Sequence, residues 1–266
     1  MGNIKWVIQN NMRRGFNVDK LIDMLDVQGV KWEHIPYIPF DLSYVHNIET
    51  DGVTIFYGST GLVRTVHEIG KWLPGVFFSV ERFSFEALLE GFGEHLLNAD
   101  SQVMTVGEFL GRGYHSDDYL FVRPNLDSKI FTGVSQSFGE FRETWEHPLK
   151  TPSEGSLFSR NTQIQVATPK SIAREMRSFV VNGKISTSSY YGSKMKDPVE
   201  PKDIAFAERM AALYQPAPVF VLDTCAMMDD SMKVVETNCF NSSGLYWVDV
   251  YQLTQDVNAF CLNFAE

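Results

Sequence analysis

The chain lacks the long apolar runs that a membrane protein needs. No stretch of roughly 18 apolar residues, the length required by a bilayer-spanning helix, occurs in the sequence. The first residues also lack a charged leader followed by an apolar stretch, so we expect no secretory signal. Trp6 stands where a myristoylation motif that begins at Gly2 would carry Ser or Thr. We therefore expect a cytoplasmic protein, in the host cytoplasm if a phage encodes it, with no membrane partner.

Cysteines and basic residues are also scarce. Cys225, Cys239 and Cys261 are odd in number and lack CxxC spacing, which favours reduced and mostly buried thiols. The formal net charge is −10 at pH 7. A protein that coats nucleic acid needs a basic surface, so we do not expect nucleic acid as a partner. The glycine-rich segment 58–61 lacks the Gly-Lys-Ser/Thr ending of a Walker loop, and the histidines lack HExxH spacing.

What is present is the composition of a globular α/β protein. Hydrophobic residues make up 44% of the 266 residues, enough to bury a core without disulfides. Asn17 is expected to cap the first helix and Gly29 to end it. Alternation of strands and helices predicts an α/β unit with parallel strands. The expected elements are a strand at 5–9, a helix at 17–25, an extended segment at 32–40, a strand at 53–57, a helix ending at 71, a strand at 76–80 and a helix at 84–97.

The second half has a different pattern, typical of α+β structure. Asn182-Gly183 between two strand-like runs predicts a tight hairpin. We place a domain boundary between an N-terminal α/β domain, residues 1–112, and a second domain, residues 113–266. The expected strands lie at 119–124, 162–167, 176–181, 184–190, 219–223 and 233–236, and the expected helices at 204–213 and 248–264.

Three oxygen-bearing side chains form the most informative group. Asp223 ends one apolar strand, and Glu236 and Asn238 lie on the same side of the next strand because strand side chains alternate. If the two strands pair, these side chains meet on one face and offer the hard oxygen ligands that Mg²⁺ prefers. The alternative is that Asp223 and Glu236 only cap or pair at strand ends. The spacing alone leaves both interpretations open.

Three cations are candidates for phosphate or carboxylate binding. Arg123 precedes Pro124 at a strand end, where a guanidinium can bind phosphate oxygens through two hydrogen bonds. Lys129 lies in the following loop and could add a second charge, although a solvated surface lysine is the favoured alternative. Arg177 begins an apolar strand and is either an ion-pair partner of Glu175 or a clamp for a reacting carboxylate.

Several motifs occur in an order that is similar to the ATP-grasp superfamily. These are residues 121–124, 165–167, 175–184, Asp223 and 236–246. The last one closely resembles the Glu-x-Asn-x-x-Asn-Ser-x-Gly-Leu-Tyr signature of a small branch found in bacteria and their phages. The likeness covers about residues 115–266. It implies an α/β N-terminal domain followed by an α+β ATP-grasp fold, whose two subdomains clasp the nucleotide.

The resemblance also implies roles for individual residues. Arg123 stands where most members have a phosphate-binding lysine, and Arg177 matches an arginine that faces the transferred phosphoryl group and the substrate carboxylate. The main chain of residues 165–167 would read adenine. Asp223, Glu236 and Asn238 match the magnesium ligands. The full set of implied site residues is Arg123, Lys129, Gln165, Val166, Ala167, Arg177, Asp223, Glu236, Asn238, Asn241, Ser242 and Ser243.

One departure from the family pattern concerns charge. Most members carry an additional phosphate-binding lysine earlier in the chain, but no lysine lies between Lys71 and Lys129. Either Lys129 compensates, or Arg123 carries more of the charge, or the ATP site is degenerate. Residues 241–243 either bind the polar end of a substrate or serve as ordinary turn residues.

The resemblance implies an enzyme that uses ATP and Mg²⁺ to join a carboxylate to an amine or a similar nucleophile through an acyl-phosphate. The substrates would be small molecules or peptides. Two alternatives stay open, namely a catalytically silent nucleotide-binding module and a kinase that stops at phosphorylation. The sequence leaves the oligomeric state open as well, with a homodimer among the options.

Overall fold

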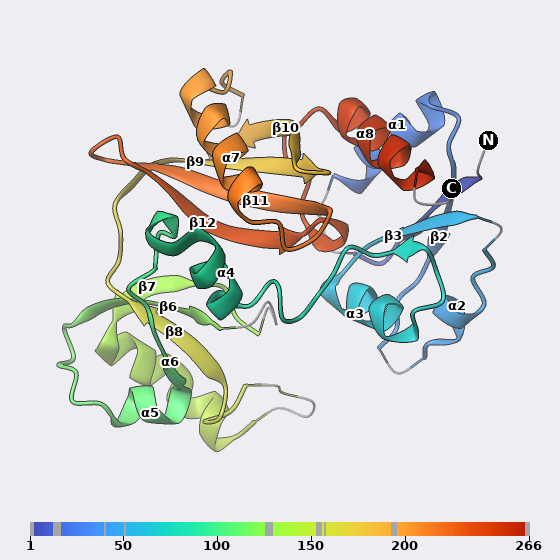
Figure 1. Cartoon of the computed structure of the whole chain (residues 1–266). Helices are drawn as coiled ribbons and strands as arrows, with labels where there is room; N and C mark the ends of the chain where they lie inside the picture. The colour runs from blue at the N-terminus through green and yellow to red at the C-terminus, as the bar shows by residue number, and fades with distance from the viewer. Residues whose placement is uncertain are drawn as a thin grey trace. The chain divides into compact units, whose positions relative to one another are not determined.

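The structure, a computed structural model, describes residues 3–12, 17–39, 41–50, 52–125, 130–152, 156, 158–192 and 196–263. The chain divides into two compact units (Figure 1). Unit 1 combines Met1–Phe83 with Ile172–Glu266, and unit 2 is Ser84–Ser171. The domain boundary expected between residues 112 and 113 stays a prediction. Across the described residues, none of the helices combines the length and apolar character that crossing a bilayer requires.

Unit 1 begins with a four-stranded sheet in the order β2-β1-β3-β4, with all strands parallel. The predicted parallel α/β pattern is therefore confirmed. Every residue of β3 is buried, as the β-branched and aromatic composition of this strand favours. The elements are β1 (Ile4–Gln9), α1 (Val18–Val27), β2 (Lys31–Ile35), α2 (Ser43–His46), β3 (Val53–Tyr57), α3 (Thr60–Ile69) and β4 (Pro74–Gly75).

Two local predictions in this region are wrong. The strand expected at 76–80 lies at Pro74–Gly75 instead, and beyond it the main-chain N–H of Phe77 donates to the side chain of Asn241. Asn17 stands at the N-cap position of α1 but has a left-handed backbone, φ 53°, and makes no side-chain cap. Its amide Nδ2 donates to the carbonyl oxygen of Tyr246 at 2.6 Å. In both places a distant partner takes the polar group that the local pattern assigned to its neighbours.

The second sheet of unit 1 is antiparallel, in the order β10-β9-β11-β12. The predicted hairpin at Asn182-Gly183 is confirmed, and both turn residues have positive φ, as this kind of turn requires. The elements are β9 (Ile172–Val181), β10 (Lys184–Tyr190), α7 (Pro201–Leu213), β11 (Val219–Met227), β12 (Met232–Cys239), the 3-10 helix η3 (Phe240–Ser242) and α8 (Val250–Leu262).

Phe240 joins the cores of the two sheets in unit 1. Its ring lies 6.1 Å from Trp6 of β1 and 6.1 Å from Phe179 of β9, both in edge-to-face geometry. Tyr57 of β3 and Phe77 approach the same ring at 6.0 and 6.2 Å. Aromatic pairs in this geometry add stability beyond the burial of their area. The residue directly after β12 therefore fixes one sheet against the other.

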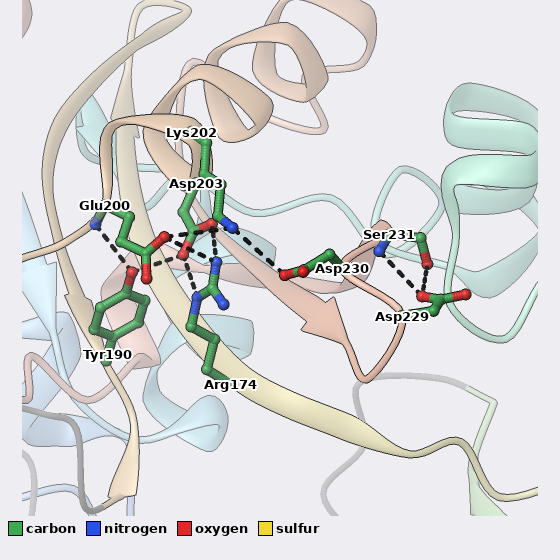
Figure 2. Close-up of polar contacts among 8 residues, drawn as sticks. All are labelled: Arg174, Tyr190, Glu200, Lys202, Asp203, Asp229, Asp230 and Ser231. Atoms are coloured by element: carbon green, nitrogen blue, oxygen red, sulfur yellow. Dashed lines mark hydrogen bonds and ion pairs between the residues drawn. The ribbon is translucent and has the colours of Figure 1, made fainter.

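A buried ion pair attaches α7 to one face of the antiparallel sheet (Figure 2). Arg174 of β9 donates from Nε and Nη2 to the two carboxylate oxygens of Asp203, at 2.7 and 2.8 Å. The hydroxyl of Tyr190 donates to the same carboxylate at 2.6 Å. Asp203 is 2% exposed, so this charge is compensated almost entirely by its two partners.

Unit 2 contains an antiparallel sheet in the order β5-β8-β6-β7. Its core gathers Phe109, Phe138, Phe141 and Trp145 against the strands. Helix α6 was not predicted, although Ser137 and Glu140 form a capping box that marks its start. The elements are α4 (Phe85–Phe92), the 3-10 helix η1 (Gly93–His95), β5 (Gln102–Thr105), α5 (Val106–Gly111), β6 (Tyr119–Pro124), β7 (Val134–Ser137), α6 (Phe138–Lys150) and β8 (Gln163–Ala167).

Candidate active site

Charged side chains gather on the face of the antiparallel sheet opposite to α7. Asp223 of β11 is paired with Arg177 of β9 on one side and with Glu236 of β12 on the other. Directly opposed residues of neighbouring strands place their side chains on the same face. Asn238 follows Glu236 by two positions and shares that face. The predicted pairing of the two strands that carry Asp223 and Glu236 is therefore confirmed.

Arg177 and Asp223 form a buried, two-pronged ion pair. Nε of Arg177 donates to Oδ1 of Asp223 at 2.9 Å, and Nη2 donates to Oδ2 at 2.7 Å. Arg177 is 7% exposed and Asp223 1%. Burial raises the pKa of Asp223, although the guanidinium opposes this shift. Burial acts to lower the pKa of Arg177, but Asp223 outweighs it and raises that pKa, so the guanidinium stays charged.

Asn238 links the two carboxylates of the predicted magnesium set. Its amide Nδ2 donates to Oδ2 of Asp223 at 3.0 Å and to Oε1 of Glu236 at 2.9 Å. The three side chains named by the sequence are therefore in direct contact. For Asn238 to ligate a cation through Oδ1, its amide group must turn over, since the NH₂ group now faces the carboxylates. Each carboxylate oxygen keeps a second lone pair for a cation, so the set fits a hard divalent ion.

Glu175 is a third carboxylate on this face that the sequence interpretation did not assign to the site. It precedes Arg177 by two positions on β9, so both side chains lie on one side of the strand. Burial and the charges of Asp223 and Glu236 raise the pKa of Glu175 to about 7. The period of two along 175–177 was the available indication. This shift reports an excess of negative charge that a bound cation would relieve.

The metal-binding set is a mixed one. In the part of the chain that the structure describes, no three His, Cys, Asp or Glu side chains converge as a metal cage. The candidate ligands are therefore two carboxylates and one amide, with Glu175 beside them. A set with few protein ligands is typical of Mg²⁺, which keeps waters and substrate phosphates as its other ligands.

Glu175 gives a pH dependence with a defined sign. The folded-state pKa is raised to about 7, above the ordinary value of roughly 4.3. Between these values the folded protein binds more protons than the unfolded chain, so the free energy of unfolding falls as pH rises. Without Mg²⁺, we expect wild type to lose about 2 to 3 kcal/mol more than Glu175→Gln between pH 5 and 8. Urea unfolding across this range tests it, and parallel profiles would contradict it.

Residues 241–243 are buried and make structural hydrogen bonds. Asn241 accepts from the N–H of Phe77 at 2.8 Å and donates to the carbonyl oxygen of Phe56 at 2.6 Å. Ser243 Oγ donates to the carbonyl oxygen of Cys239 at 2.7 Å. Ser242 is 2% exposed. These contacts agree with the turn interpretation, and the substrate contact predicted for Asn241, Ser242 and Ser243 stays a prediction.

The remaining predicted residues belong to unit 2. Arg123 of β6 is half-buried and is paired with Gln165 of β8. Gln165 and Val166 have strand partners on both sides, in β5 and β6. Ala167 is the last residue of β8 and is paired only with Phe121 of β6. Of these residues, Ala167 is therefore the best placed for main-chain contact with a base. Lys129 lies outside the described residues.

The comparison with known families decides the identity of the fold. The profile of a family described as an ATP-grasp domain, the third family of its clade, matches residues 65–260, which is most of the chain. This chain belongs to the ATP-grasp family. The resemblance in the residue motifs and the expected fold class are thereby confirmed. Among curated proteins, the comparison finds no match.

Solved structures show the same ATP-grasp fold. The D-alanine–D-alanine ligase from Coxiella burnetii has a TM-score of 0.65 at 10% identity, over 99% of this chain and 96% of that chain. The RimK domain ATP-grasp protein from Sphaerobacter thermophilus has a TM-score of 0.59 at 13% identity, over 98% and 99%. The ATP-grasp ligase PsnB, complexed with a precursor peptide and AMPPNP, has a TM-score of 0.60 at 11% identity, over 98% and 97%.

Proposed function

We propose that this ATP-grasp protein is a ligase that uses ATP and Mg²⁺ to join a carboxylate to an amine or a related nucleophile. The observation that carries the proposal is the contact of Arg177, Asp223, Glu236 and Asn238 on one sheet face. That face combines a fixed guanidinium for anionic oxygens with an oxygen set for a divalent cation. The structurally similar proteins include D-alanine–D-alanine ligase and PsnB, both named as ligases.

The proposed reaction has two steps. A carboxylate oxygen attacks the terminal phosphorus of ATP, the bond from that phosphorus to the bridging oxygen breaks, and ADP leaves. The amine nitrogen then attacks the carbonyl carbon of the acyl-phosphate, phosphate leaves, and the nitrogen loses a proton. Both steps rely mainly on positioning and on stabilisation of charge, so a covalent enzyme intermediate is not needed.

Arg177 is the residue we propose to orient the reacting carboxylate. A guanidinium has five N–H donors in a fixed plane. Two of them contact Asp223, and Nη1 donates to the carbonyl oxygen of Gly244 at 3.1 Å. The named bonds therefore use three donors and leave two for substrate oxygens. Because Asp223 fixes the plane of the group, these donors point in defined directions.

Asp223, Glu236 and Asn238 would hold Mg²⁺. When bound, this ion neutralises charge on the ATP phosphates and makes the terminal phosphorus easier to attack. We assign Arg123, with help from Lys129, to the transferring phosphoryl group, and the main chain of residues 165–167 to adenine. Residues 241–243 complete the substrate side of the proposal.

The substrate class we favour is a small molecule or a peptide that carries a free carboxylate, with an amine as its partner. PsnB is described with a precursor peptide, which supports the peptide class by similarity of fold. We place the enzyme in the cytoplasm, where ATP and Mg²⁺ are available, and residues 1–112 as a domain that precedes the ATP-grasp part.

Trapping of the acyl-phosphate tests the proposal. With ATP, Mg²⁺ and a panel of amino acids, small carboxylates and peptides, we expect hydroxylamine to yield a hydroxamate and ADP in equal amounts. Removal of Mg²⁺ with EDTA should abolish both products. Arg177→Lys should lower hydroxamate formation more than ATP binding, because the lysine lacks the planar, two-pronged geometry.

Other products would point to other functions. ADP without hydroxamate indicates a kinase that acts on a hydroxyl group. Binding of ATP with neither product across the panel indicates a silent nucleotide-binding module. AMP in place of ADP contradicts the acyl-phosphate route, whichever substrate is used.

A further inference from the structure

The guanidinium of Arg177 lies against two tyrosine rings as well as against Asp223. Its Cζ atom is 5.3 Å from the ring centre of Tyr191 and 4.9 Å from that of Tyr246. The two rings are themselves in edge-to-face contact at 5.0 Å. A cation at this distance from an aromatic face is attracted to it, and more strongly when water is excluded. Arg177 is therefore held by a carboxylate and by two aromatic rings.

Tyr246 adopts a backbone conformation that tyrosine seldom has. Its φ is 47°, in the left-handed region that favours glycine. A residue keeps such a conformation only when its surroundings impose it, and these residues concentrate at functional sites. Tyr246 is also 38% exposed, so burial of its ring does not account for its place.

Two residues of the N-terminal helix region hold the main chain around Tyr246. Nδ2 of Asn17 donates to the carbonyl oxygen of Tyr246 at 2.6 Å. Nζ of Lys20 donates to the carbonyl oxygen of Val248 at 3.0 Å. Leu245, between Gly244 and Tyr246, is fully buried and anchors the segment from the inside. The segment 244–248 is thus fixed on both sides of the strained residue.

The same segment contacts Arg177 twice. The carbonyl oxygen of Gly244 accepts from Nη1 at 3.1 Å, and the ring of Tyr246 covers the guanidinium. Hydrogen bonds in the plane of a guanidinium fix its rotation within that plane, whereas an aromatic ring restricts tilting out of the plane. Asp223 and Gly244 supply the first restraint, and Tyr191 and Tyr246 supply the second.

We propose that Tyr246, supported by Tyr191, is a positioning residue that holds the Arg177 guanidinium in the orientation needed for the reacting carboxylate. The proposal rests on the ligase function proposed above and assigns Tyr246 to the carboxylate side of the reaction. The ring, and not the hydroxyl, carries the effect. The left-handed backbone is the structural cost of placing the ring there.

The sharpest variant is Tyr246→Gly, because glycine accepts the left-handed backbone and removes only the ring. We expect it to fold at least as stably as wild type, to raise the KM for the carboxylate roughly 10-fold, and to leave the KM for ATP within about 2-fold. Tyr246→Phe keeps the ring and should stay within about 2-fold of wild type in both constants. Tyr251→Ala removes an exposed tyrosine of α8 and serves as the matched control.

A second measurement does not depend on turnover. In the ligand-free protein, the Nε–H of Arg177 should exchange slowly with solvent, and Tyr246→Gly should speed this exchange roughly 10-fold, whereas Tyr246→Phe and Tyr251→Ala should not. If wild type shows no ligase activity but the exchange pattern holds, the proposed function fails and the aromatic restraint stands. Unchanged exchange and an unchanged KM for the carboxylate in Tyr246→Gly would overturn the proposal, as would equal rises in both KM values.

Discussion

Asp223→Ala is expected to abolish ligase activity and, at the same time, to lower the free energy of unfolding by about 3 to 5 kcal/mol. Both oxygens of Asp223 accept hydrogen bonds from Arg177, and both residues are almost fully buried. The substitution leaves a buried guanidinium without its counter-charge, which is why the stability loss is large. ADP release and urea unfolding, measured on the same preparation, test the two effects.

Glu236→Ala is the matched comparison within the same site. Glu236 is half-buried at the other end of the group, so its removal should cost about 1 kcal/mol or less while turnover is still lost. A paired replacement, Arg177→Met with Asp223→Leu, should recover most of the stability without activity, since it removes both buried charges. Retained stability in Asp223→Ala, or full turnover in Glu236→Ala, would contradict this assignment.

Asp203→Ala is expected to lower the free energy of unfolding by about 3 to 5 kcal/mol without a change in the KM for either substrate. Asp203 is 2% exposed and accepts from Arg174 and Tyr190, so its loss strands a largely buried guanidinium (Figure 2). Arg174 and Arg177 are three positions apart on β9, so their side chains lie on opposite faces. The effect should therefore be confined to folding.

Glu200→Ala is the control for this ion pair. Glu200 also approaches Arg174, at 3.4 Å, but its side chain is 49% exposed. Water screens the interaction, so we expect a change of about 0.5 kcal/mol or less. A large loss in Glu200→Ala, or a rise of the carboxylate KM in Asp203→Ala, would show that the two faces of the sheet are coupled.

Several elements could be predicted from local patterns alone. The Asn182-Gly183 turn requires positive φ at both positions, so two residues were enough to predict the hairpin. The period of two in β12 placed Glu236 and Asn238 on one face before any partner was known. The segment 236–246 indicated the ATP-grasp family, which the family profile confirms.

Other elements depend on partners that local patterns do not show. Asn17 looks like a helix cap, but its amide serves a carbonyl group more than two hundred residues away, at Tyr246. The apolar run at 76–80 looks like a strand, but Asn241 takes the N–H of Phe77. Helix α6 was missed although its capping box is local, because its polar residues weaken the apolar periodicity.

The sequence by itself determined which residue types are available for the site and on which side of each strand they lie. It could not determine the order of the strands in the sheet. Because β9 pairs with β11, Arg177 meets Asp223, 46 positions away, in the buried ion pair, although Glu175 is its near neighbour. The left-handed backbone of Tyr246 was likewise decided by distant contacts, since tyrosine has no local preference for it. Side-chain alternation follows from local geometry, whereas strand pairing depends on the free energy of the whole core.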